Sequence, residues 1–292
     1  MAVPITPSLV IALSLSMAPP QHPAAVQRSL PESSCGAGEA QPSSAESRQL
    51  PGEMSTDRPD TSDSTDVVGR GLWQVETGFS FEADSEGGVS QNEIAVPLVM
   101  LRIGLHPRFE MRVSSEGLLS DVIRAPAGRV RVTGRSDVQV SAKWKLFTRP
   151  RRCFVLALEP VVSLPAGSDA FTSGGVDPML KFIIDRGLPG GFSVSANIVV
   201  SSDTDAGSRF TQQGTSASFS HALPRGWTGF AEIFTSSALS RGGGRAWIVD
   251  GGASRPIGHR LQVDVSAGRG LSEPAPDWFI GAGFAVRGFL GR

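Results

Sequence analysis

The chain has 292 residues and a mass of 30.7 kDa, a length that an all-β barrel can use as a single domain. Its 34 glycines and 21 prolines, with 40% hydrophobic and 19% charged residues, favour many short strands over long helices. The 27 basic and 28 acidic side chains give a net charge of -1, which excludes a sequence-wide attraction to nucleic acid.

The N-terminus is typical of an export signal followed by a disordered arm. Leu9 to Ala18 is the longest apolar stretch, too short for a membrane-crossing helix of about 20 residues but suited to a signal-peptide core. We expect the signal to cover residues 1–18, or to extend to residue 25, although no Lys or Arg precedes Arg28. Residues 19–66 are rich in Pro, Ser and acidic side chains, which predicts disorder.

The arm ends in an Asp-rich lead-in, residues 55–66, with acidic residues around one Arg-Pro pair: Asp57, Arg58, Pro59, Asp60, Asp63 and Asp66. A calcium loop requires oxygens at alternate positions, a glycine and a closing Glu, and a spacing of three does not provide them. We therefore expect no metal site. The lead-in either anchors the arm at the periplasmic mouth of a barrel or folds into its lumen.

From residue 67 onward apolar and polar residues alternate in short segments, as in strands with one apolar and one wet face. In the first segment Trp73 and Val75 lie on one face, and Gln74 and Glu76 lie on the other. About twelve such segments, an even number as bacterial barrels require, follow in chain order: 73–82, 94–105, 109–116, 137–146, 154–164, 179–185, 192–200, 215–223, 229–235, 245–253, 261–268 and 279–289.

The spacers between these segments alternate in length. Residues 106–108 and 224–226 are tight and suit periplasmic turns, whereas residues 117–135 are long and suit an outer loop. The pattern predicts an all-β, antiparallel, up-and-down transmembrane β-barrel of about 12 strands over residues 67–292.

A soluble barrel or sandwich would show the same alternation with its apolar face inward. Charged residues recur in the middle of the wet faces, where a water-filled lumen would accommodate them. The chain has no Tyr, so an interfacial aromatic girdle must consist of Phe and the five Trp residues. We expect the membrane version, in the bacterial outer membrane.

Ten charged residues on the wet faces are candidates to line the lumen and contact a solute: Glu76, Arg102, Glu110, Arg112, Asp137, Lys143, Glu232, Asp250, Asp264 and Arg287. The alternative is a salt-bridged scaffold that only solvates the interior. About twelve strands imply a lumen narrower than that of a sixteen-stranded porin.

Two stretches at the ends of the barrel carry a family resemblance. Residues 55–79 read STDRPDTSDSTDVVGRGLWQVETGF, and residues 261–288 read LQVDVSAGRGLSEPAPDWFIGAGFAVRG. Both resemble the outer-membrane transporter-like family named for the MetA pathway of phenol degradation. The resemblance implies a twelve-stranded barrel that passes small compounds, aromatic ones included.

The sequence favours a channel over an enzyme. Outer-membrane lipases pair a His with a Ser on one strand face, but His106, His221 and His259 have no Ser two positions later. Cys35 and Cys153 lack the spacing of a zinc site, and we expect no catalytic residue and no cofactor. The expected partners are outer-membrane lipid, a small organic solute and the barrel-assembly machinery, with the chain a monomer. A non-conducting structural barrel stays open as an alternative.

Overall fold

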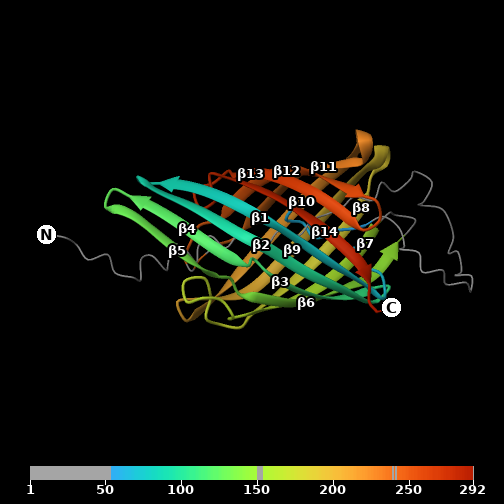
Figure 1. Ribbon diagram of the computed structural model, residues 1–292, viewed down its shortest axis with the longest axis horizontal. Coiled ribbons are helices and arrows are strands. Elements are labelled where there is room, and N and C mark those ends of the chain that lie inside the picture. The colour runs from blue at the N-terminus through green and yellow to red at the C-terminus, as the bar shows by residue number, and fades with distance from the viewer. Residues whose placement is uncertain (1–53, 150–153, 239, 241, 292) are drawn as a thin grey trace, which may run out of the picture.

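The computed structural model describes residues 54–149, 154–238, 240 and 242–291, which form one antiparallel sheet closed into a barrel (Figure 1). The predicted signal peptide, the arm up to residue 53, Cys35 and Cys153 lie outside these residues. Within the described part, no helix is long and apolar enough to cross a membrane.

The sheet contains fourteen strands. In chain order they are β1 Leu72–Glu86, β2 Val89–His106, β3 Phe109–Ser115, β4 Leu118–Ala125, β5 Gly128–Arg135, β6 Val138–Arg149, β7 Phe154–Leu164, β8 Asp177–Gly187, β9 Phe192–Asp205, β10 Ser208–Leu223, β11 Trp227–Ser236, β12 Ala246–Ile257, β13 Leu261–Gly270 and β14 Trp278–Phe289. From β6 to β14 each strand pairs with the next one in the chain. The ring closes because β1 pairs with both β2 and β14.

Two wall strands are each interrupted once. β2 pairs with β3 along its second half and with β4 along its first half, so β3 and β4 act as one wall strand. β5 and β6 form the next one, because β5 pairs with β4 and β6 pairs with β3. The fourteen strands therefore make a barrel of twelve, as the sequence predicts. Gly117 marks one interruption: its φ is 72°, and a Cβ there would collide with the backbone of Pro97.

The prediction of an outer loop over residues 117–135 is wrong, because these residues form the β4–β5 hairpin at the outer end of the barrel (Figure 1). Pro126 and the glycines at positions 117, 128 and 134 give the segment a loop-like composition. Hydrogen bonding to β2 holds the chain extended here. The local composition cannot predict this pairing, because β2 is a separate segment of the chain.

The two faces of the wall are the reverse of those in a soluble protein. Large apolar side chains point outward, and Trp144, Phe219 and Val265 are 54%, 53% and 50% exposed. Glu110 and Lys143, which are opposite each other in β3 and β6, are fully buried on the inner face. Apolar residues outside and charges inside are the arrangement that lipid outside and a polar interior require. The chain is an outer-membrane barrel.

The barrel ends differ in the length of their connections. The chain enters β1 and leaves β14 at the same end (Figure 1). The described connections at this end are all short, among them the 3-10 segments η4 Pro189–Gly191 and η5 Pro224–Gly226, whereas long ones such as residues 165–176 between β7 and β8 lie at the other end. The turns predicted at residues 106–108 and 224–226 are thus confirmed. Short turns mark the periplasmic end, and the β1–β2 and β4–β5 hairpins project from the outer end.

Candidate functional site

Four basic side chains from separate wall strands project into the lumen: Arg102 on β2, Arg112 on β3, Lys143 on β6 and Lys181 on β8. The first three are fully buried. A buried cation without a partner is costly, so carboxylates have to reach all of them inside the barrel.

Some partners belong to the wall itself: Glu76 and Glu110 lie 2.9 and 3.0 Å from Arg102. The others come from residues 54–68, which precede β1 and which we call the plug segment. The carboxylate of Asp57 lies among three bases, with its Oδ2 3.0 Å from Lys143 Nζ and 3.3 Å from Arg102 Nη1. Arg112 also pairs with this oxygen. One buried carboxylate therefore faces cations from β2, β3 and β6 at once.

A second plug carboxylate completes the arrangement. Asp63 lies 3.1 Å from Arg112 Nη1, 3.5 Å from Lys143 Nζ and 2.8 Å from Lys181 Nζ. Arg112 is further neutralised by the wall carboxylate Glu159 at 3.0 Å. Lys143 also donates to the Ser64 carbonyl at 2.6 Å. The ion pairs of Asp57 and Asp63 together connect four wall strands, β2, β3, β6 and β8, with the plug segment.

Wall carboxylates also bind the plug segment, by accepting hydrogen bonds from its backbone N–H groups. The plug segment forms no regular structure, so its N–H groups need partners other than its own carbonyls. The wall supplies them through hydrogen bonds from Asp57 N–H to Glu76 at 2.9 Å, from Thr61 N–H to Glu232 at 2.6 Å, from Thr65 N–H to Asp185 at 2.7 Å and from Val68 N–H to Glu110. Asn197 binds both the N–H and the carbonyl of Asp63, at 2.7 and 3.0 Å.

Arg58 occupies a place that two glycines leave open. Its Nη2 is 3.1 Å from Asp264 Oδ1 on β13. Gly78 on β1 and Gly283 on β14 are opposite each other in the register. A Cβ on Gly78 would stand 2.7 Å from Arg58 Nη2, and one on Gly283 would stand 2.6 Å from Arg58 Nε. The guanidinium therefore lies directly against the wall backbone.

The rest of the lead-in is held as well. Pro59 is buried, and Asp60 accepts a hydrogen bond from Ser218 at 2.6 Å. Asp66 pairs with Lys145 at 2.9 Å. Of the two placements left open by the sequence, the structure therefore has the lead-in inside the lumen. Residues 54–66 belong to the range expected to be disordered. In the structure, ion pairs with the wall order them, and the composition of the arm gives no information about these partners in the wall.

The ten lumen candidates divide into two groups. Seven contact the plug segment: Glu76, Arg102, Glu110, Arg112, Lys143, Glu232 and Asp264. The other three lie elsewhere: Asp137 accepts from Gly167 N–H at 2.9 Å and Ser173 N–H at 3.1 Å, Asp250 is opposite Glu232 in the register, and Arg287 Nε donates to the His259 carbonyl at 2.9 Å. Their contact with a solute stays a prediction.

Sequence reasoning missed Glu159, Lys181, Asp185 and Asn197. On the inner face of β8, Ile183 lies between Lys181 and Asp185 and is fully buried, so the wet face of that strand is not uniformly polar. Glu159 is flanked in the same way by Ala157 and Val161. The available signal was the row of plug aspartates, because a buried aspartate favours a cation nearby, and this signal could have indicated Lys181 alone of the four.

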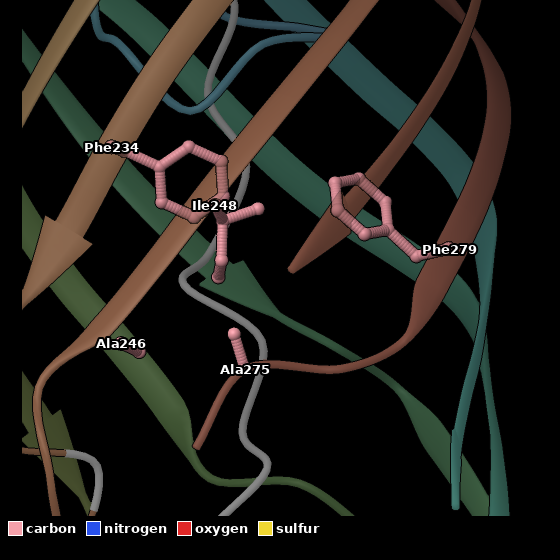
Figure 2. Packing of buried hydrophobic residues seen from close by; sticks show 5 residues of the cluster. All are labelled: Phe234, Ala246, Ile248, Ala275 and Phe279. Carbon is pink, nitrogen blue, oxygen red and sulfur yellow. The ribbon is translucent and has the colours of Figure 1, made fainter. Parts of the chain in front are cut away.

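The lumen holds a cavity of about 320 Å³ on the outer side of the plug segment, which we call the outer chamber. Thr61 of the plug segment and Lys181 contribute to its lining. One wall is apolar: Figure 2 shows Phe234 of β11, Ala246 and Ile248 of β12, Phe279 of β14 and Ala275 packed as a cluster. All of these except Ala275 line the cavity.

Among the described residues, no histidine lines the outer chamber. Within the described ranges, no three His, Cys, Asp or Glu side chains are placed to hold a metal ion. His221 stacks on Phe192 with ring centroids 4.2 Å apart, and its Nδ1 lies 3.1 Å from the Gly191 carbonyl at the periplasmic end. It is engaged in the turn and does not face the outer chamber.

One family model and several solved structures are similar to this chain. The family model described as "Putative MetA-pathway of phenol degradation" matches residues 56–288, a range that begins inside the plug segment. The COG4313 outer membrane channel from Pseudomonas putida F1 is similar with a TM-score of 0.57 and 13% identity, over 77% of this chain and 98% of that chain. The CymD monoaromatic hydrocarbon channel is similar with a TM-score of 0.42 and 9% identity, over 77% of this chain and 90% of that chain. The transport unit of the autotransporter AIDA-I from Escherichia coli is similar with a TM-score of 0.49 and 10% identity, over 75% of this chain and 90% of that chain. A search of curated proteins gives no match.

Proposed function

The chain belongs to the family of the MetA pathway of phenol degradation, and from this premise we propose that it is an outer-membrane channel for small organic solutes, aromatic ones among them. Passage is gated, because the plug segment has to move before a solute can cross the lumen. The candidates that contact the plug segment act in this proposal by holding the gate, and a solute reaches them once the segment has moved.

The observation that carries the proposal is how the lumen is occluded. In the described residues, the contacts between plug segment and wall are ion pairs, hydrogen bonds and packing. Such contacts can be exchanged for water without opening the ring of strands. A purely structural barrel needs no detachable segment, because side chains of the wall can fill a narrow lumen.

We further propose that the chain catalyses no reaction and takes no cofactor. The histidine closest to a lipase-like arrangement, His221, is adjacent to Ser220 in sequence, so the two side chains point to opposite faces of β10. The chain acts as a monomer in this proposal, with lipid on the apolar outer face and the barrel-assembly machinery as its partner during insertion.

The test compares single-channel conductance in planar bilayers for the full chain and for Asp57→Asn. The substitution leaves Arg102, Arg112 and Lys143 with one carboxylate fewer, which costs about 3 kcal/mol of plug binding. We expect low conductance for the unmodified chain, and larger and more frequent openings for the variant.

The matched control is Asp277→Asn, an equally conservative change at an exposed position of the outer end. It should conduct like the unmodified chain. If all three proteins fold in lipid but stay electrically silent and tight to small solutes, the chain is not a channel.

A further inference from the structure

The outer chamber has an unbalanced charge. Seven carboxylates line it: Glu82, Glu93, Glu116, Asp137, Asp177, Asp203 and Asp205. Among its described lining residues, Lys181 is the one base, and this base is already paired with Asp63 of the plug segment at 2.8 Å. Arg209, outside the lining, lies 3.7 Å from Asp177. The bases around the plug segment are paired with carboxylates, whereas most carboxylates of the chamber have no basic partner among the described lining residues.

Part of this acidity is concentrated on one side. Glu82 on β1 is directly opposite Glu93 on β2, and Glu93 is directly opposite Asp121 on β4. Glu116, at the interruption between β3 and β4, is close enough to interact electrostatically with Glu82 and Glu93. Three neighbouring wall strands thus bring four carboxylates together, which we call the acidic wall.

The acidic wall has no counter-charge within the described chain. Among the described residues, no ion pair within 4 Å includes Glu82, Glu93 or Glu116, and their strongest electrostatic neighbours are carboxylates. Asp121 is fully buried; its Oδ2 accepts a hydrogen bond from Gln91 at 3.0 Å, and its Oδ1 has no hydrogen-bond partner among the residues that the structure describes. Burial and like charges this close favour the protonated form of these carboxyl groups, so a cation bound here stabilises their charged form and relieves the repulsion.

Aromatic rings lie beside these carboxylates. Phe279 of the apolar cluster is directly opposite Glu82 in the register of β14 and β1. Phe171, Phe210 and Phe234 also line the chamber. The face of an aromatic ring attracts organic cations, and several rings together are a known way to bind quaternary ammonium groups. The cavity is also of the size of small-molecule sites, which begin at about 300 Å³.

We infer that the outer chamber is a binding site for small organic cations, amines or quaternary ammonium compounds that carry an aromatic or aliphatic group. The apolar part of the ligand packs on Phe234, Ile248 and Phe279, and the cationic part faces the acidic wall. Anions such as carboxylates and sulfonates are rejected. This inference rests on the proposed channel function only for the route by which the ligand arrives.

Binding is tested with three probes of similar size and different permanent charge: benzyltrimethylammonium, benzyl alcohol and benzenesulfonate. The full chain is held in lipid nanodiscs, and dissociation constants are measured by titration calorimetry. We expect the cation to bind at least about tenfold more tightly than the alcohol, and the sulfonate not to bind. Equal binding of all three, or preference for the sulfonate, overturns the inference.

Two variants connect the preference to the acidic wall. Glu82→Gln and Glu116→Gln keep the shape of the side chain and remove its charge, and each should weaken benzyltrimethylammonium about tenfold while leaving benzyl alcohol unchanged. Glu273→Gln, at an exposed position outside the chamber lining, is the control and should change neither constant. An unchanged cation affinity in both chamber variants, folded as judged by heat-modifiable migration, overturns the inference.

Flux through proteoliposomes separates this inference from the proposed function. Binding of the cation without any solute flux supports the site and contradicts the channel. Flux that is equal for the three probes, with no measurable binding of the cation, supports the channel and contradicts the site.

Discussion

Arg58 depends on two positions of the wall where no side chain exists. Gly78 and Gly283 are opposite each other, and any Cβ there would overlap the guanidinium. A glycine pair in adjacent strands would ordinarily weaken a sheet, since it contributes no cross-strand packing. Here the pair creates room for a charged group of another segment, and Asp264 neutralises that group.

Gly283→Ala should therefore displace Arg58. The added methyl would stand 2.6 Å from Arg58 Nε and 2.4 Å from the backbone oxygen of Thr77, and overpacking of this kind costs about 1–3 kcal/mol. We expect more frequent channel openings in planar bilayers. Gly252→Ala is the control, because its added methyl would stand 2.3 Å from the backbone oxygen of Val265 and so strains the wall without touching the plug segment. Identical gating by both variants would contradict this role of Gly283.

At the level of single residues, alternation is a good guide to the inner face. It places Glu76, Lys143 and Asp264 there, and all three are buried. It cannot indicate what an inward charge contacts, because the partner can be distant in sequence: Lys143 and Asp57 are 86 residues apart. Periodicity reports the direction of a side chain and nothing about its partner.

At the scale of elements, the plug segment and the β4–β5 hairpin are the two that local sequence describes poorly. The plug segment has a composition typical of disorder, and its order comes from ion pairs with the wall. The hairpin resembles a loop in composition and is extended by its pairing with β2. In both, structure depends on a partner distant in sequence, whereas strands such as β9 and β13 carry their own pattern.

Excision of residues 55–66 tests the plug segment as an element. We expect conductance to rise above that of Asp57→Asn, because the lumen then contains only water and wall side chains, and the freed bases become hydrated. The barrel should still close, since every ring contact lies between Leu72 and Phe289.

The control shortens the hairpin by a similar length. Replacing residues 122–131 with Asn-Gly keeps the Asp121–Val132 pair as the last one and supplies a two-residue turn. This variant should conduct like the unmodified chain. A plug excision that conducts no more than this control would mean that the plug segment does not obstruct passage.

At the scale of the whole molecule, the ring of twelve strands is what the sequence predicts best. Short alternating segments, tight turns and the even strand number all follow from local rules. Closure depends on one seam, in which β1 pairs with β14 from Leu72–Phe289 to Ala83–Trp278.

Heat-modifiable gel migration tests this closure. The folded barrel should migrate differently before and after boiling. Thr77→Pro, which removes a backbone donor from β1 between its two partners, should abolish the difference. Val130→Pro, on β5, which pairs with β4 alone, should keep it. Equal behaviour of the two variants would contradict the assignment of the seam.

The contacts of Arg58 also set an order for assembly. The plug segment precedes β1, yet Arg58 pairs with Asp264, which lies 206 residues later. The binding site of Arg58 therefore exists only when nearly all of the wall has formed. Contacts this distant in sequence form late, because the chain between them must be ordered first. The plug segment, which precedes every strand, is thus the last part to dock. A barrel that has inserted with a missing or shifted strand lacks part of the binding site of the plug segment, and its lumen stays open. Occlusion of the lumen therefore indicates that the wall is complete.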